Sequence, residues 1–176
     1  MRVWEESPFH EGDDLPVPVW ESILNRSAIV QVRGQAISLL ARSEHTRFLL
    51  TQKLIQRDLP ADIIPSVLDD LERDGALSDR RYAESWVRSR LSGHPEDPRH
   101  MVARLRERGV AGDLAADVVR SVMRDDGTDE RALAREYAER LTRRRALSAD
   151  EIADKLARRG FSHRVARSIA DDLGPR

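Results

Sequence analysis

The segment TRFLLTQKLIQRDL, residues 46–59, is present three times in this chain in altered form. Its counterparts are DPRHMVARLRERGV at residues 97–110 and SADEIADKLARRGF at residues 148–161, so each copy begins 51 residues after the one before. Apolar positions keep this register without a gap, as at Leu54, Leu105 and Leu156. A period of this length is typical of stacked helical units that bury their apolar faces against one another.

Residues that start helices follow the same period. Two sets are spaced by 51 residues: Ser27, Ser78 and Asp129, then Thr46, Asp97 and Ser148. Their short polar side chains accept hydrogen bonds from the free N–H groups of a first helical turn, so we expect all six to be N-caps. Pro98 suits the first helical position, and Glu151 completes a capping box with Ser148.

Residues that end helices also recur. Gly109 and Gly160 are each followed by an apolar residue, which predicts a Schellman C-cap with a glycine at positive φ. The first copy has Asp58 at this place, a poorer left-handed residue. Pro65 fits a helix only in its first turn, so we expect Asp62 to be the N-cap before it.

These patterns predict an all-α protein of three tandem three-helix repeats that form an elongated, curved, solenoid-like body. We place the repeats at residues 27–77, 78–128 and 129–176. Residues 1–26 carry an excess of acidic side chains and several prolines, and we expect a flexible or edge-packed extension there. We expect its tryptophans, Trp4 and Trp20, to dock on the helical body rather than contact a partner.

Composition limits the class of protein. The chain has no cysteine and a formal net charge of −1, so it forms no disulfide and lacks the strong positive charge of an autonomous nucleic-acid binder. Its apolar runs are too short to span a membrane and its acidic start does not resemble a secretory signal. We expect a cytoplasmic monomer.

Catalytic patterns are missing from the sequence. The five histidines occupy unrelated positions of the repeat, and the chain has no glycine-rich phosphate loop, nucleophile motif or metal-ligand spacing. We therefore expect no enzymatic activity, no catalytic residue, no bound metal and no cofactor.

Basic side chains recur in the second helix of each repeat. The pairs are Lys53 with Arg57, Arg104 with Arg108, and Lys155 with Arg159, and a further cluster lies at Arg143, Arg144 and Arg145. One interpretation is a surface that binds phosphates or an acidic protein groove, because an i,i+4 pair shares one helix face. The other is that cations simply favour helix C-termini. We take these nine residues as the candidate partner-binding set.

Acidic side chains crowd the third helix of the first repeat, at Asp69, Asp70, Glu72 and Asp74. Carboxylates near a helix C-terminus oppose the helix dipole, so another contact must favour them. Pairing with neighbouring arginines and simple solvation are the alternatives.

Three segments resemble the bacterial RecX family: LLARSEHTR at residues 39–47, LERDGALSDRRYAESWVRSRL at residues 71–91, and KLARRGFSHRVARSI at residues 155–169. The resemblance implies an elongated helical regulator, without catalytic residues or cofactor, that binds the groove of the RecA recombinase filament on single-stranded DNA. It implies modulation, usually inhibition, of the ATPase, strand-exchange and coprotease activities of RecA in DNA repair, recombination and the SOS response. Leu49 and Asp58 depart from the family pattern at two helix ends of the first repeat.

A second class of function stays open from the residues alone. Three-helix units with arginine-rich helices are also typical of helix-turn-helix-like proteins that bind DNA without RecA. A weak direct contact with DNA is compatible with either class.

Overall fold

The computed structural model describes residues 16–93, 95–143 and 145–174, and these residues form nine α-helices and no strand. The helices are α1 Val17–Leu40, α2 Arg47–Ile55, α3 Ile64–Arg73, α4 Asp79–Gly93, α5 Pro98–Glu107, α6 Gly112–Asp125, α7 Glu130–Thr142, α8 Ala149–Arg158 and α9 His163–Leu173. The predicted all-α class is confirmed. None of the described helices combines the length and the apolar character that crossing a bilayer requires.

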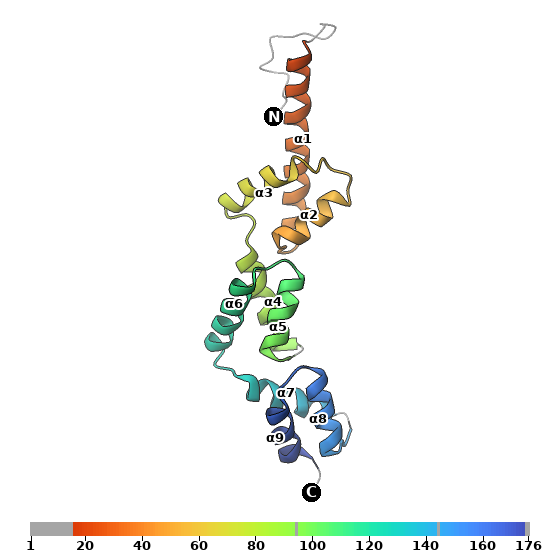
Figure 1. The fold of residues 1–176 in the computed structure, drawn as a ribbon, viewed down its shortest axis with the longest axis vertical. Helices are drawn as coiled ribbons and strands as arrows, with labels where there is room; N and C mark the ends of the chain where they lie inside the picture. Colours follow the sequence, from red (N-terminus) through yellow and green to blue (C-terminus); the bar gives the residue numbers. More distant parts are fainter. Residues whose placement is uncertain (1–15, 94, 144, 175–176) are drawn as a thin grey trace.

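The helices form three groups of three that follow one another along the long axis of the molecule (Figure 1). We call α1–α3 the first unit, α4–α6 the second and α7–α9 the third. In the first helix of each unit, two apolar residues four positions apart are fully buried: Val32 and Ala36, Ala83 and Val87, and Ala134 and Ala138. The unit boundaries at residues 77/78 and 128/129 stay predictions.

Most of the predicted N-caps are present. Thr46, Asp97, Asp129 and Ser148 each accept a hydrogen bond from a first-turn N–H, and the Arg81 N–H lies 3.3 Å from Ser78 Oγ. Glu151 completes the capping box with Ser148, as predicted. Pro65 does lie in the first turn of α3, but the N-cap is Ile63, so the prediction of Asp62 is wrong.

The N-cap predicted at Ser27 is also wrong, because α1 begins ten residues earlier, at Val17. Pro16 is its N-cap and Pro18 lies in the first turn, where proline costs no hydrogen bond. Trp20 lies on this N-terminal part of α1 and is 48% exposed, so it does not dock on the helical body as expected. Trp4 lies outside the described residues.

The second helices end as the period predicts. Asp58, Gly109 and Gly160 have φ values of 57°, 87° and 87°. After each of them an apolar residue donates its N–H to a carbonyl of the last helical turn, as from Val110 to Leu105 at 3.1 Å. All three ends are therefore Schellman caps, and Asp58 adopts the left-handed conformation that glycine tolerates better.

Successive units meet through these helix ends. The Thr46 hydroxyl, at the start of α2, donates to the Arg108 carbonyl at the end of α5 over 2.6 Å. One period later the Asp97 N–H, at the start of α5, donates to the Arg159 carbonyl at the end of α8 over 3.3 Å. The N-terminal, positive end of the helix dipole of α2 thus meets the C-terminal, negative end of α5, and α5 meets α8 in the same way. This favours a head-to-tail arrangement of the three second helices.

Glycine makes this contact close. A Cβ atom placed on Gly109 would lie 2.2 Å from Phe48 Cβ, and one placed on Gly160 would lie 2.5 Å from a ring atom of His100. Both glycines therefore serve two purposes, a positive φ at the cap and the room for a side chain of the preceding unit.

Candidate partner-binding surface

The second member of each predicted basic pair turns toward the first helix of its own unit. Arg57 donates to Gln35 Oε1 over 2.6 Å, whereas the guanidinium carbons of Arg108 and Arg159 lie 5.2 and 4.9 Å from the ring centres of Trp86 and Tyr137. The contacted positions are themselves 51 residues apart, at 35, 86 and 137. These three arginines therefore pack the unit together.

Arg104 has a different partner in its own chain. Its Nε lies 3.2 Å from Oε2 of Glu96, a carboxylate that is only 1% exposed, while Oε1 of Glu96 has Arg90 Nε at 3.8 Å and no hydrogen bond among the described residues. A buried carboxylate is costly unless it is paired. Arg104 is consequently committed to stabilising Glu96.

The two lysines are the remaining members of the predicted pairs; Lys53 is exposed and Lys155 is half-buried. Lys53 lies in the last turn of α2 and Lys155 in the last turn of α8, at equivalent places in the first and third units. They are the only lysines of the chain. Neither forms an ion pair with another described residue, so both are available to a partner.

The arginine cluster after α7 is divided. Arg143 is the exposed C-cap of α7, Arg144 lies outside the described residues, and Arg145 donates to Glu151 Oε1 over 2.6 Å. The hydrogen bond from the Ser148 N–H lowers the pKa of the Glu151 carboxyl, against some desolvation and with help from Arg145. Arg145 thus supports the capping box of α8.

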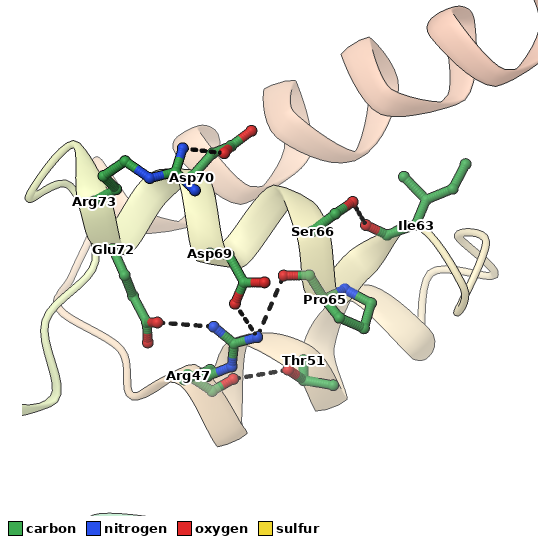
Figure 2. A network of polar contacts seen from close by, with 9 residues as sticks. All are labelled: Arg47, Thr51, Ile63, Pro65, Ser66, Asp69, Asp70, Glu72 and Arg73. Atoms are coloured by element: carbon green, nitrogen blue, oxygen red, sulfur yellow. Dashed lines mark hydrogen bonds and ion pairs between the residues drawn. The ribbon is translucent and has the colours of Figure 1, made fainter.

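The acidic third helix of the first unit is paired with arginines, as one of the two alternatives predicted. Figure 2 shows Arg47 of α2 pointing between two carboxylates of α3: it lies 2.8 Å from Asp69 and 2.8 Å from Glu72, and it donates to the Pro65 carbonyl at 3.2 Å. Burial opposes the charge of Arg47, but the hydrogen bond to Asp69 and the charge of Glu72 outweigh it and raise the pKa of the guanidinium. Arg73 pairs with Asp70 in the same view.

Sequence reasoning missed the residues that hold the arginines, although the register contained them. Positions 35, 86 and 137 lie one period apart, and two of them are aromatic. The i,i+4 spacing shows that the two basic side chains of a pair lie on one face of their helix. It does not show which residue of a neighbouring helix packs against that face. Among the described residues, no group of three or more acidic or histidine side chains is placed to hold a metal ion.

Comparison with known proteins assigns a family. Family models described as the first and second three-helix domains of RecX match residues 33–71 and 78–119. The regulatory protein RecX of Halorhodospira halophila is 38% identical over 157 residues, which are 82% of this chain and 92% of the relative. That of Thermobifida fusca is 30% identical over 169 residues, which are 94% of this chain and 91% of the relative.

Solved structures share the fold. A crystal structure of regulatory protein RecX superposes with a TM-score of 0.73 at 22% identity, covering 93% of this chain and 83% of the other. RecX from Lactobacillus salivarius gives a TM-score of 0.64 at 22% identity, covering 84% and 97%. Because the curated relatives align over most of both chains, this chain belongs to the RecX family of regulatory proteins.

Proposed function

We propose that the chain binds the RecA filament on single-stranded DNA and lowers its ATPase activity, and with it strand exchange and coprotease activity. Membership of the RecX family, a family of non-enzymatic regulators, carries this proposal and implies regulation of RecA. The row of three units supports it, because a repeated junction produces an extended surface suited to a filament (Figure 1).

The cations Lys53, Lys155 and Arg143, none of which forms an ion pair with another described residue, are the residues that we propose to contact RecA or DNA phosphates directly. Five other members of the predicted set, Arg57, Arg104, Arg108, Arg145 and Arg159, act at this surface chiefly by holding it in shape, since they have partners within the chain. The lysines lie two periods apart, so they would meet an extended ligand at separate points.

The first test is a titration of RecA ATPase on single-stranded DNA with this protein. The rate should fall as the protein is added, and the protein without RecA should hydrolyse no ATP. An unchanged RecA rate at a large excess of the protein would sink the proposal.

Amine-reactive footprinting locates the contact, because Lys53 and Lys155 are the only lysines of the chain. Labelling of both side chains should fall when RecA filaments are present and stay constant when RecA or DNA is added alone. Equal labelling in every mixture would remove the lysines from the interface.

The same measurements address DNA binding without RecA. A chain that used DNA as its sole partner would bind a labelled oligonucleotide in the absence of RecA and lose it steeply as salt is raised. We expect at most weak binding of this kind, since the net charge is −1 and several arginines are occupied within the chain. We further propose that the protein acts as a cytoplasmic monomer, which sedimentation analysis would check.

A further inference from the structure

An open hollow of about 510 Å³ lies between α5 and α6 beside the start of α7, and we call it the α5–α6 hollow. Its floor is apolar, with Pro98, Val102, Val119 and Met123 among the lining residues. Val119 and Met123 belong to the buried core, so the floor is held by the packing of the second unit. The packing of the core of the second unit therefore determines the shape of the hollow.

Three arginines surround this floor: Arg99, Arg120 and Arg124. All three are exposed, and none forms an ion pair with another described residue. Two acids also line the hollow, and each is held by a backbone N–H: Asp129 Oδ1 accepts the Ala132 N–H at 2.8 Å and Glu130 Oε1 accepts the Ser162 N–H at 2.9 Å. Three arginines outnumber these two carboxylates, so the lining carries an excess of positive charge.

The 51-residue register shows what fills the same place in the first unit. There the counterpart of Pro98 is Arg47, whose guanidinium lies against α3 between Asp69 and Glu72 (Figure 2). Those two acids correspond to Arg120 and Met123 of the second unit. The second unit has thus lost the side chain that covers the floor, and one of the two acids has become an arginine.

The third unit closes this place in another way. Arg167 forms an ion pair of 2.7 Å with Asp150, the counterpart of Arg99. Gly174, the counterpart of Met123, lies so close to Ala149 that an added Cβ atom would be 2.9 Å from the alanine Cβ. In the first and third units an ion pair joins the second helix to the third helix at this position. Among the described residues, the second unit has no ion pair between α5 and α6.

We infer that the α5–α6 hollow binds an acidic peptide segment of a partner protein, with an apolar side chain on the floor and flanking carboxylates on the arginines. The first unit suggests the chemistry of the ligand. There two carboxylates of α3 bind the guanidinium of Arg47, whereas the arginines around the hollow of the second unit would bind carboxylates of a ligand. Arginine and carboxylate form charge-assisted, bidentate hydrogen bonds. The apolar floor favours a peptide over a nucleic acid, because its side chains are aliphatic and the lining holds no aromatic ring on which a base would stack.

The test uses a labelled peptide with a central Leu-Phe pair between runs of glutamate, and fluorescence anisotropy with the full chain and no RecA. The peptide should bind, and the amide resonances of Val102, Val119 and Met123 should shift. A peptide with alanines at the centre and one with lysine flanks should each bind about tenfold or more weakly. Absence of binding, or equal binding of all three peptides, overturns the inference.

Two variants assign the binding to the hollow. Arg120→Glu should weaken the peptide about tenfold or more, whereas Arg164→Glu, the same charge change on an exposed residue of α9, should leave it unchanged. Equal effects of the two variants contradict the assignment. An unlabelled single-stranded oligonucleotide should not displace the peptide, and full displacement would make the hollow a nucleic-acid site instead.

Transfer of the first-unit residues to the second unit tests whether the missing Arg47 network is what leaves the hollow open to a ligand. Pro98→Arg, Arg120→Asp and Met123→Glu together rebuild the Arg47 network in the second unit. The grafted chain should fold, as its helical circular dichroism would show, and bind no peptide. A folded graft that binds as well as the parent overturns the inference; if the graft does not fold, the Arg120→Glu comparison decides.

Discussion

The Thr46 hydroxyl donates a hydrogen bond of 2.6 Å to the carbonyl oxygen of Arg108, across the junction between the first and second units. The Thr46 hydroxyl oxygen also accepts the Leu49 N–H at 3.1 Å, so one fully buried side chain caps α2 and joins it to α5. The repeat period thus describes both the fold of each unit and the contact that joins it to the next.

Removal of this hydroxyl should weaken the first junction. Thr46→Val keeps the shape of the side chain but leaves the Leu49 N–H and the Arg108 carbonyl without their partner, and we expect a loss of about 1–2 kcal/mol in the free energy of unfolding. Urea denaturation measures it. Thr46→Ser retains the hydroxyl and should lose much less, so equal losses would show that the hydrogen bonds are not the cause.

The close approach at Gly109 should make it more sensitive than another glycine of positive φ. Gly109→Ala adds a Cβ against Phe48, whereas Gly127→Ala adds one where nothing lies within 4 Å. The strained φ should cost each variant about 1 kcal/mol, and crowding should cost Gly109→Ala about 1–3 kcal/mol more. Equal melting temperatures of the two variants would contradict the packing described for this junction.

The first unit should gain stability from a better cap. Asp58 has a φ of 57°, so Asp58→Gly should raise the free energy of unfolding by up to about 1 kcal/mol. Asp126, an exposed C-cap with a φ of −80°, is the matched control, because glycine brings no relief there. If Asp58→Gly melts no higher than the parent, the strain at this cap is not significant.

Glu96 should depend on Arg104 for its place in the interior. Arg104→Ala leaves a buried carboxylate with only the more distant Arg90, and we expect a loss of about 1–3 kcal/mol. Glu96→Leu should cost less, because Leu147 is buried at the equivalent position of the third unit. The double variant should resemble Glu96→Leu alone, and additive losses would argue against the pairing.

The fold was largely predictable because caps and apolar positions share one period. The start of α1 was not, since Ser27 resembles its counterparts Ser78 and Asp129, while the helix signal around Pro16 and Pro18 has no equivalent in the later units. Equivalent positions in the 51-residue repeat therefore adopt the same local structure only where the neighbouring residues are also similar.

The candidate surface was predictable only in part for a related reason. Lys53 and Arg57 are equally basic in sequence, yet the longer, forked side chain of Arg57 reaches Gln35 while Lys53 remains exposed. Charge and spacing identify cations that share a helix face. Which of them the chain uses for its own packing depends on the opposing helix, a tertiary contact that the spacing does not encode.

The most direct test of the account compares RecA inhibition by the parent chain with that by the variant Lys53→Glu with Lys155→Glu. ATPase on single-stranded DNA is measured over the same range of protein concentrations, and thermal melting is measured in parallel. The variant should melt like the parent and require at least about tenfold more protein for the same inhibition, because two separated contacts are reversed at once. Arg26→Glu with Arg164→Glu, which changes the charge equally at two exposed residues outside the proposed surface, should inhibit like the parent. Full inhibition by a folded Lys53→Glu, Lys155→Glu variant would contradict the proposed surface, and absence of inhibition by the parent itself would contradict the proposed function.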